Sequence, residues 1–390
     1  MFNINALLEK TKGDRWIWLI IIMLSLISIM AVYSSTAGIA YRKGMSVERY
    51  LLFKHVIFVL LGIGMIYISH LLDYKYYAGI SKILMIITLP LLVYTLVFGS
   101  SINDASRWVK IPVINLTFQT SDLAKLALIT FLARMLTKKQ ENIKDVKNAF
   151  VPIMGSVCVV FVLIALANLS TALMLFGVSI LLLIIGRISI KQIALVCGGG
   201  ILLLMFVVFL GPRRETYNSR INTFMHPELQ SSDKTYQADH AKIALASGGL
   251  FGKGPGNSTE RNFLPHPYSD FIFAIIIEEY GTVGGLSIMV LYLVLLYRCV
   301  RIVTRSPKAF GALLAAGLSF SLTIQAFANM AVAVGLGPVT GVPLPLVSMG
   351  GTSMIFTSIA FGIILSVSRD VEENSTKQEK IIVGEIPAMA

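Results

Sequence analysis

Charged side chains are scarce in this chain. Asp, Glu, Lys and Arg supply only 14% of its 390 residues, and hydrophobic residues supply 55%, whereas soluble domains are about 25% charged. The composition therefore excludes an ordinary soluble protein. Cysteine is also rare: Cys158, Cys197 and Cys299 all lie in or beside apolar segments, so neither a disulfide framework nor a cysteine metal cluster is expected.

Apolar runs of about 20 residues, long enough to cross the hydrocarbon core of a bilayer, recur along the chain. The first begins near Trp16 and is too long for a cleaved signal peptide, so we expect it to remain as an anchor. The runs predict an all-α polytopic membrane protein. About ten transmembrane helices are expected, at 17–36, 55–72, 79–99, 120–137, 149–168, 170–186, 189–210, 270–297, 309–335 and 348–368.

Two boundaries in this pattern are weakly marked. The fourth run has a polar start, Ser121-Asp-Leu-Ala-Lys125, and the break between the fifth and sixth depends on Asn168 and Ser170. Residues 1–369 are predicted to form a single transmembrane domain. Residues 370–390 are polar and are predicted to form a disordered cytoplasmic tail.

The distribution of basic residues predicts the orientation. With the N-terminus in the cytoplasm, most of the 33 Lys and Arg residues fall in cytoplasmic segments, as the positive-inside rule requires. Both termini are then cytoplasmic, and the long 211–269 loop is extracytoplasmic. Because the net charge of +12 partly reflects this topology, it gives no support to nucleic-acid binding.

The 211–269 loop is long, glycine-rich and basic, and loops of this length are usually functional or disordered. Its 241–251 run has helical spacing and enough apolar side chains to lie on a membrane surface, so we expect a structured loop seated on the outer face. The following Gly252-Lys-Gly-Pro-Gly-Asn-Ser258 does not have Walker A spacing. It is either a flexible turn or a cradle in which backbone amides and Lys253 hold an anion.

Asp270 lies where this polar loop becomes a strongly apolar helix, with aromatic residues beside it. One interpretation is that it caps the helix and interacts with the helix dipole. The other is that it is a base acting on the headgroup of a membrane-bound substrate, because the position lies between water and lipid.

Charges also occur within the apolar runs, where each costs roughly 2.5–3.5 kcal/mol on insertion scales and tends to mark function. Asp122 and Lys125 can pair on one helix face. Glu278 lies about 80° from Asp270 around the helix, whereas Glu279 lies nearly opposite, at about 100° per residue. A pairing role and a catalytic role both remain open for these glutamates.

Proline and glycine crowd the segment from Gly335 to Ser353, which cannot continue a helix. Irregular backbone at membrane depth is tolerated where it is buried in protein or lines a water-filled cavity. Together with Gln325 and Asn329 just before it, the segment is either the wall of a polar outer cavity or an ordinary tight loop.

Several motifs are spread over nearly the whole chain. They are Ala31-Val-Tyr-Ser-Ser35, Arg107-Trp108, Phe118-Gln-Thr-Ser-Asp-Leu-Ala-Lys125, Gly248-Gly-Leu-Phe-Gly-Lys-Gly-Pro-Gly-Asn-Ser258, Leu264-Pro265, Asp270-Phe-Ile-Phe-Ala274, Glu278-Glu279, and the Pro343-Leu-Pro345 and Gly350-Gly-Thr-Ser353 block. Together these motifs resemble the SEDS family (shape, elongation, division and sporulation), polytopic proteins of bacterial cell-wall synthesis. The serine pair in the first span and the Thr340–Pro345 run look more like the FtsW division branch than the RodA elongation branch.

The resemblance implies a peptidoglycan glycosyltransferase of the bacterial inner membrane that polymerises lipid II at the division septum. It implies a class B penicillin-binding protein and other divisome proteins as partners. The family's essential loop aspartate maps onto Asp270 and its intramembrane lysine onto Lys125. The chain departs from the family pattern at Asn168, Thr120 and Asp122, and His266 and Tyr268 stand where Glu and His are common.

The implied reaction inverts MurNAc C1, forms a β-1,4 bond to a GlcNAc 4-hydroxyl and releases undecaprenyl diphosphate. Asp270 is the predicted base, because such a displacement needs one proton acceptor and cations for the leaving diphosphate. The candidate diphosphate and sugar ligands are Lys125, Arg107, Arg220, Lys253, Gln119, Ser121, Glu278, Gln325, Asn329 and Ser348. A divalent cation, Mg²⁺ or Mn²⁺, bound through Asp270 would do similar work.

Two other classes of function fit the same membrane architecture. A lipid II flippase would use the cavity without chemistry, although we find no inverted repeat of the kind many transporters contain. A scaffold that only recruits division partners would need none of the polar residues within the spans.

Overall fold

The computed structural model describes residues 12–384, apart from residues 44, 103–104, 112–115, 212 and 230–231. A long helix occupies each of the ten predicted segments, which confirms the helical membrane fold. They are α2 (Arg15–Lys43), α3 (Met45–Leu71), α4 (Tyr74–Phe98), α5 (Thr120–Lys138), α6 (Val151–Ala167), α7 (Leu169–Ile185), α8 (Ile190–Leu210), α11 (Ile272–Arg305), α12 (Ala309–Ala333) and α13 (Thr352–Gly384).

Within the described residues, eight of these helices are long and apolar enough to cross a membrane. Helix α7 is apolar but has only 17 residues, and the 19-residue α5 begins with the polar stretch that contains Asp122 and Lys125. A count of ten spans therefore stays a prediction for these two helices.

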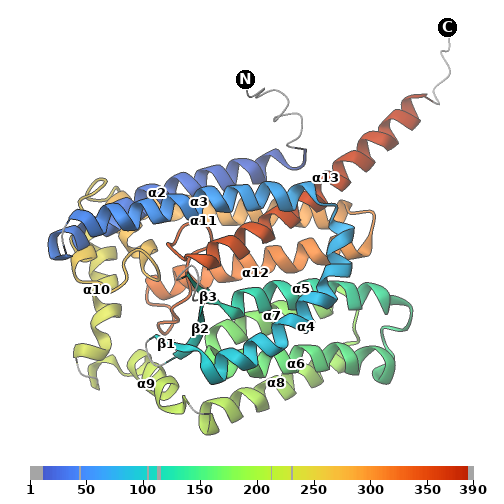
Figure 1. Cartoon of the computed structure of the whole chain (residues 1–390), viewed down its shortest axis with the longest axis horizontal. Helices are drawn as coiled ribbons and strands as arrows, with labels where there is room; N and C mark the ends of the chain where they lie inside the picture. The colour runs from blue at the N-terminus through green and yellow to red at the C-terminus, as the bar shows by residue number, and fades with distance from the viewer. Residues whose placement is uncertain are drawn as a thin grey trace.

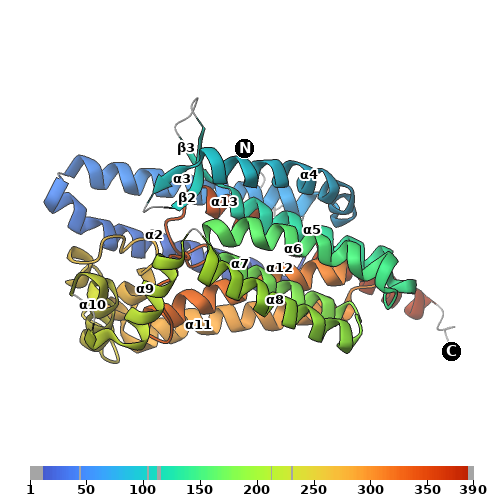
Figure 2. The ribbon, with the colours of Figure 1, turned by 90° about the horizontal axis from the view of Figure 1, so that it is seen from below.

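The helices lie side by side in one bundle, with the short helices α9 (Arg214–Met225) and α10 (Ser232–Gly248) gathered at one end (Figures 1 and 2). We call this the loop end. At the opposite end, Gly13 N donates to Glu372 Oε2 at 2.9 Å and Asp14 N donates to Ser368 Oγ at 2.9 Å. The start of α2 and the last part of α13 therefore meet on the same side of the bundle. That this end is cytoplasmic and the loop end extracytoplasmic stays a prediction.

The 211–269 segment is structured, since it contains α9 and α10 as well as the short 3-10 helices Pro227–Leu229 and Glu260–Asn262. Helix α10 packs along α11, and the Glu260–Asn262 turn packs against α2. The predicted 241–251 helix coincides with the second half of α10 and the turn that follows it.

A small antiparallel sheet was not predicted. It consists of β1 (Ser100–Ile102), β2 (Ala105–Ile111) and β3 (Leu116–Gln119), in that order. Trp108 on β2 pairs with Gln119 on β3, directly before α5. The sheet therefore brings Trp108 beside the polar start of α5.

Helix α11 is broken at Gly281, whose φ of 70° and ψ of −174° are not helical. The break leaves the carbonyls of Glu278 and Glu279 without helical partners, and the amides of Lys253 and Gly254 donate to them at 2.9 Å each. These two amides are therefore engaged within the protein. This favours the interpretation of residues 252–258 as a turn over their interpretation as an anion cradle.

Helix α13 continues to Gly384 and projects beyond the bundle (Figure 1). The prediction of a disordered tail from residue 370 is wrong over the described part. The run from Arg369 to Lys380 is rich in Glu, Lys and Gln, which are good helix formers, so polarity alone did not indicate disorder. Residues 385–390 lie outside the described residues.

Candidate active site

A cavity of about 690 Å³ opens at the loop end, where the first residues of α11 and α13 approach the sheet and α9. We call it the Asp270 cavity. Its size lies within the range of about 300–1,000 Å³ that is usual for ligand sites. Its polar lining includes Lys54, Gln119, Arg220, Gln237, His266, Tyr268, Ser269, Asp270 and Ser353, and its aromatic lining includes Trp108 and Phe271.

Asp270 contributes its carboxylate to this cavity and is partly buried. Ser269 Oγ donates to Asp270 Oδ1 at 2.9 Å. Oδ2 faces Gly341, where a Cβ atom would lie 3.4 Å from it. The N-cap of α11 is Phe271, which makes no side-chain cap bond, so the structure gives no support to the capping interpretation of Asp270.

Three predicted site residues fix the backbone around Asp270 rather than projecting free polar groups into the cavity. Asn329 Nδ2 donates to Asp270 O at 2.9 Å and to Val342 O at 2.7 Å. Ser348 Oγ donates to Ser269 O at 2.7 Å. Gln325 Nε2 donates to Pro343 O at 2.9 Å.

These bonds tie the irregular 335–353 segment to the residue that carries the carboxylate. Gly341, Pro343, Gly350 and Gly351 from this segment line the cavity. The segment is therefore a wall of a polar cavity, which was the functional interpretation of its composition.

Two described cations line the Asp270 cavity. Arg220 Nη1 donates to Val339 O at 3.0 Å, and burial together with the nearby Arg213 lowers the pKa of Arg220. The second cation is Lys54 of α3, which was not among the predicted site residues. The sequence indicates this residue only weakly: Lys54 directly precedes an apolar run, on the predicted extracytoplasmic side, where positive charges are fewer.

Tyr268 adds a hydroxyl beside these charges. Burial, and secondly the Asp270 carboxylate, raise its pKa above the ordinary value. The hydroxyl therefore stays protonated at neutral pH and can donate a hydrogen bond.

Gln119 lines the Asp270 cavity, and its Nε2 donates to Ser121 Oγ at 3.0 Å. Ser121 itself is buried and faces a smaller space between α4, α5 and α6, away from Asp270. The predicted Arg107 belongs to β2, but its side chain lies outside the described residues, so its role stays a prediction.

Lys125 does not reach the Asp270 cavity. It pairs with Asp122 at 2.9 Å and donates to Gln325 Oε1 at 2.8 Å, in a small space of about 30 Å³ between α5, α12 and α13. Since Gln325 also holds Pro343 O, Lys125 is connected to the cavity wall through one side chain. Ser353 lines both spaces.

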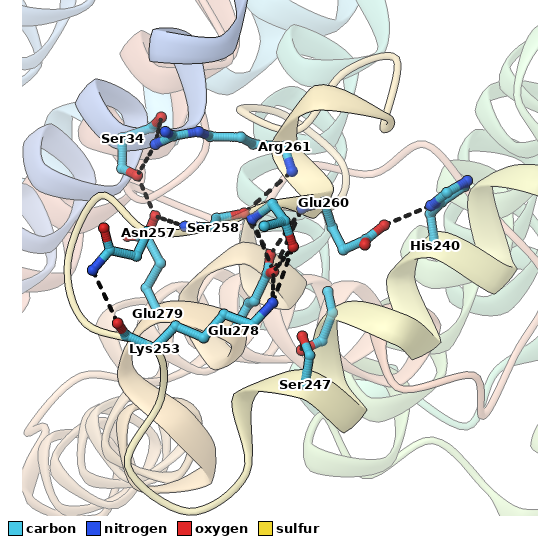
Figure 3. A network of polar contacts seen from close by, with 12 residues as sticks. Ser34, His240, Ser247, Lys253, Asn257, Ser258, Glu260, Arg261, Glu278 and Glu279 are labelled. Atoms are coloured by element: carbon cyan, nitrogen blue, oxygen red, sulfur yellow. Dashed lines mark hydrogen bonds and ion pairs between the residues drawn. The ribbon is translucent and has the colours of Figure 1, made fainter.

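Lys253 and Glu278 lie in a separate buried cluster between the loop and α11 (Figure 3). Lys253 Nζ contacts Glu278 Oε1 at 2.6 Å, and Ser258 Oγ donates to Glu278 Oε2 at 2.5 Å. The amide of Thr259 donates to the same carboxylate at 3.0 Å. The prediction that Lys253 and Glu278 contact substrate therefore finds no support, because both are engaged in fixing the loop.

The neighbouring Glu279 extends the cluster to α2. It accepts hydrogen bonds from Ser34 Oγ and from the amide of Ser258, and Arg261 Nη1 donates to Ser34 O at 3.0 Å (Figure 3). Ser34 belongs to the serine pair that contributed to the family resemblance. Its described contacts hold the loop against the first span.

No group of three or more His, Cys, Asp or Glu side chains in the described part of the chain is arranged to hold a metal ion. Asp270 is the one acidic side chain among the described residues that line its cavity. A cation such as Mg²⁺ often binds through one or two carboxylates together with substrate phosphates. The predicted divalent cation would therefore need the substrate as a ligand.

The fold and the cavity define a multi-pass helical membrane protein with a polar site at the loop end of its helices. The model of the family described as cell cycle protein (FtsW, RodA and SpoVE) matches residues 14–373, and this chain belongs to that family, the SEDS family. The expectation drawn from the sequence motifs is thereby confirmed.

Curated relatives support this assignment over nearly their whole length. Stage V sporulation protein E of Bacillus subtilis (strain 168) is 34% identical over 93% of this chain and 98% of its own. The probable peptidoglycan glycosyltransferase FtsW of Geobacter metallireducens is 33% identical over 94% of this chain and 98% of its own.

Solved structures share the fold. A chain from a structure described as the coordination of polymerization and crosslinking by a peptidoglycan synthase complex has a TM-score of 0.73 at 23% identity, covering 92% of this chain and 98% of that chain. The rod shape determining protein RodA of Thermus thermophilus has a TM-score of 0.65 at 24% identity, with coverages of 92% and 97%.

Proposed function

We propose that this protein is a peptidoglycan glycosyltransferase that polymerises lipid II. One observation carries the proposal: the Asp270 carboxylate lines a large polar cavity, together with Lys54 and Arg220, at the helix ends of a membrane bundle. The carboxylate can accept the proton of an acceptor hydroxyl, and the two cations can stabilise the charge of a leaving diphosphate. Apolar helices beside the cavity suit a polyprenyl tail.

In the proposed step, the Asp270 carboxylate takes the proton of the GlcNAc 4-hydroxyl as its oxygen attacks C1 of MurNAc. The bond between C1 and the diphosphate oxygen breaks, and undecaprenyl diphosphate leaves with the electron pair. Attack opposite the leaving group inverts C1 and gives a β-1,4 bond. Lys54 and Arg220 stabilise the departing negative charge, as preorganised cations do at phosphoryl leaving groups. A divalent cation bound through Asp270 and the diphosphate would add to this stabilisation.

Ser269, Gly341 and Asn329 position the base. The Ser269 hydroxyl orients Oδ1, and Asn329 fixes the main chain on which the carboxylate is carried. Lys125 acts from a distance, since its contact with Gln325 supports the Pro343 part of the wall. We assign Lys125 as a positioning residue.

The names of the relatives support this reaction class, since several are called probable peptidoglycan glycosyltransferase. We further propose a class B penicillin-binding protein as the transpeptidase partner, together with other divisome proteins and a location at the division septum. The partner proposal is supported by fold similarity to a component of a peptidoglycan synthase complex. The septal role is supported by relatives named FtsW.

The test uses purified full-length protein in detergent, with and without its cognate class B penicillin-binding protein, and lipid II carrying a labelled stem peptide. The partner carries a substitution of its transpeptidase serine, so that crosslinking does not complicate the gel. Ladders of glycan strands are expected. If no ladder forms under either condition, while the protein moves lipid II across liposomes, the protein is a flippase and the proposal is wrong.

A further inference from the structure

A second cavity, of about 300 Å³, lies beside the Asp270 cavity between α9, α10 and the end of α12. The two cavities share three lining residues, Arg220, Gln237 and Val339. Arg220 is bonded to Val339 O at 3.0 Å, so this pair forms part of the partition between them. The two cavities are therefore direct neighbours on either side of this pair.

The lining of the second cavity is that of a site for a neutral, hydroxyl-rich ligand. Ser219, Thr223 and Thr235 contribute hydroxyl groups, Gln237 contributes an amide, and Phe224 contributes an aromatic ring. A few polar groups set among apolar surface are typical of small-molecule sites. An aromatic ring can cover the apolar face of a sugar while hydroxyl and amide groups pair with its edge.

Charge distinguishes this cavity from a second diphosphate site. Its Lys242 faces Asp239, with 3.8 Å between Nζ and Oδ1, and both side chains are about half exposed, at 56% and 50%. The two formal charges cancel. Arg220, the other cation, lies on the boundary with the Asp270 cavity and is already close to that carboxylate.

The position of the cavity also argues against a lipid tail. Its walls are α9, α10, the Gly335–Val339 turn and Val332 at the end of α12, and α9 and α10 lie past the loop-end termini of α8 and α12 (Figure 1). Gly335 has a φ of +77°, and a Cβ there would lie 3.4 Å from Lys242 Cε, so the turn allows α10 to approach the end of α12. A ligand in the second cavity would therefore contact water and the polar residues of the loop.

We propose that the second cavity binds the saccharide backbone of the glycan strand, next to the sugars that react beside Asp270. This inference rests on the proposed function, because it extends the substrate of the same site. It assigns Thr223 and Ala238, which line the second cavity but not the Asp270 cavity, to a saccharide subsite that makes no contact with the breaking bond. Such a subsite holds the strand between successive additions and so lengthens the product.

The first test measures binding without catalysis. The probe is a soluble β-1,4-linked tetrasaccharide of N-acetylglucosamine, and binding to full-length protein in detergent is followed by saturation-transfer NMR and equilibrium dialysis. Thr223→Trp and Ala238→Phe fill the cavity from α9 and α10, respectively, and should each weaken binding by about tenfold or more. Thr223 Oγ1 bonds only locally to Ser219 O in the described contacts, so its replacement spares the tertiary structure.

Asn222→Trp is the matched control, since Asn222 is the exposed neighbour on α9 and lines neither cavity. It should bind the tetrasaccharide as the wild type does, and so should Asp270→Asn. Absence of tetrasaccharide binding by the wild type would overturn the inference. Equal binding by the wild type and both filled variants would do the same.

A second readout separates this inference from the proposed function. With labelled lipid II, Thr223→Trp and Ala238→Phe should still join the first sugars through Asp270 but should give shorter strands than Asn222→Trp. Strands of unchanged length would contradict the subsite. Tetrasaccharide binding is measured in Asp270→Asn as well. The binding result therefore tests the subsite independently of whether Asp270 is the catalytic base.

Discussion

The buried pair of Asp122 and Lys125 lies outside the Asp270 cavity and is connected to the cavity wall through Gln325. Lys125→Met removes the cation that faces Asp122 at 2.9 Å and leaves the carboxylate buried. Breaking one partner of a buried ion pair typically costs about 3–5 kcal/mol, so the midpoint of thermal unfolding in detergent should fall clearly. Polymerisation should fall too, because Gln325 loses its donor.

The double variant Asp122→Asn with Lys125→Met serves as the control for stability, because it removes both charges. It should unfold at a higher temperature than Lys125→Met alone. If the double variant regains stability and polymerises at the wild-type rate, Lys125 is a structural residue without influence on the cavity.

Lys54 is a sharper test of the cavity, since it lines the cavity from α3 and was not indicated by sequence. Lys54→Met should lower the rate at saturating lipid II by about 100-fold, the loss seen when one stabilising donor is removed from a developing anion. Lys54→Arg keeps the charge and should recover much of the rate. Equal rates for Lys54→Met and the wild type would remove Lys54 from the mechanism.

The sequence predicted Asp270, Gln325 and Asn329 as site residues from a loop–helix boundary and from polar residues before an irregular segment. In the structure Asn329 bonds to Asp270 O, and Gln325 bonds to Pro343 O in the cavity wall. The sequence did not predict that Lys253 and Glu278 pair with each other, because the two residues are 25 positions apart and their contact depends on the break at Gly281. Local sequence patterns indicate helix faces and turns. They do not indicate which loop packs against which helix.

At the scale of elements, the break in α11 is a specific and testable feature. A Cβ on Gly281 would lie 2.1 Å from Leu250 O, and its φ of 70° is strained for any other residue. Gly281→Ala should therefore destabilise the protein by at least about 1–3 kcal/mol from backbone strain alone, measured by thermal unfolding in detergent. The loop that carries the Lys253–Glu278 cluster should become sensitive to protease.

Gly155→Ala in α6 is the matched control for this prediction, because nothing lies within 4 Å of the added Cβ. It should leave stability unchanged or raise it by about 0.5–1 kcal/mol, since alanine favours a helix. Equal stability of Gly281→Ala and Gly155→Ala would contradict the break in α11.

Ten helices could be predicted because each apolar run carries its own signal of length and hydropathy. The β1–β3 sheet could not, since its strands are short and their pairing places Trp108 opposite Gln119 only after the chain turns back. The length of α13 was also missed, because a polar sequence is compatible with a solvated helix as well as with disorder.

At the scale of the whole molecule, the bundle brings together groups that are remote in sequence: Lys54 from α3, Arg220 from α9, and Asp270 from the loop just before α11. In the proposed mechanism, the helices contact the lipid part of the substrate and the loop end binds the sugar part. A polymerase of lipid-linked sugars requires both surfaces to meet at the reacting bond.

The most direct test of this account is the rate of glycan formation from labelled lipid II by Asp270→Asn and by the wild type. Both are purified in the same complex with the partner and matched for thermal stability. Removal of a general base should lower the rate by about 100- to 10,000-fold, while lipid II still binds. A rate for Asp270→Asn equal to that of the wild type would contradict the assignment of Asp270 as the base.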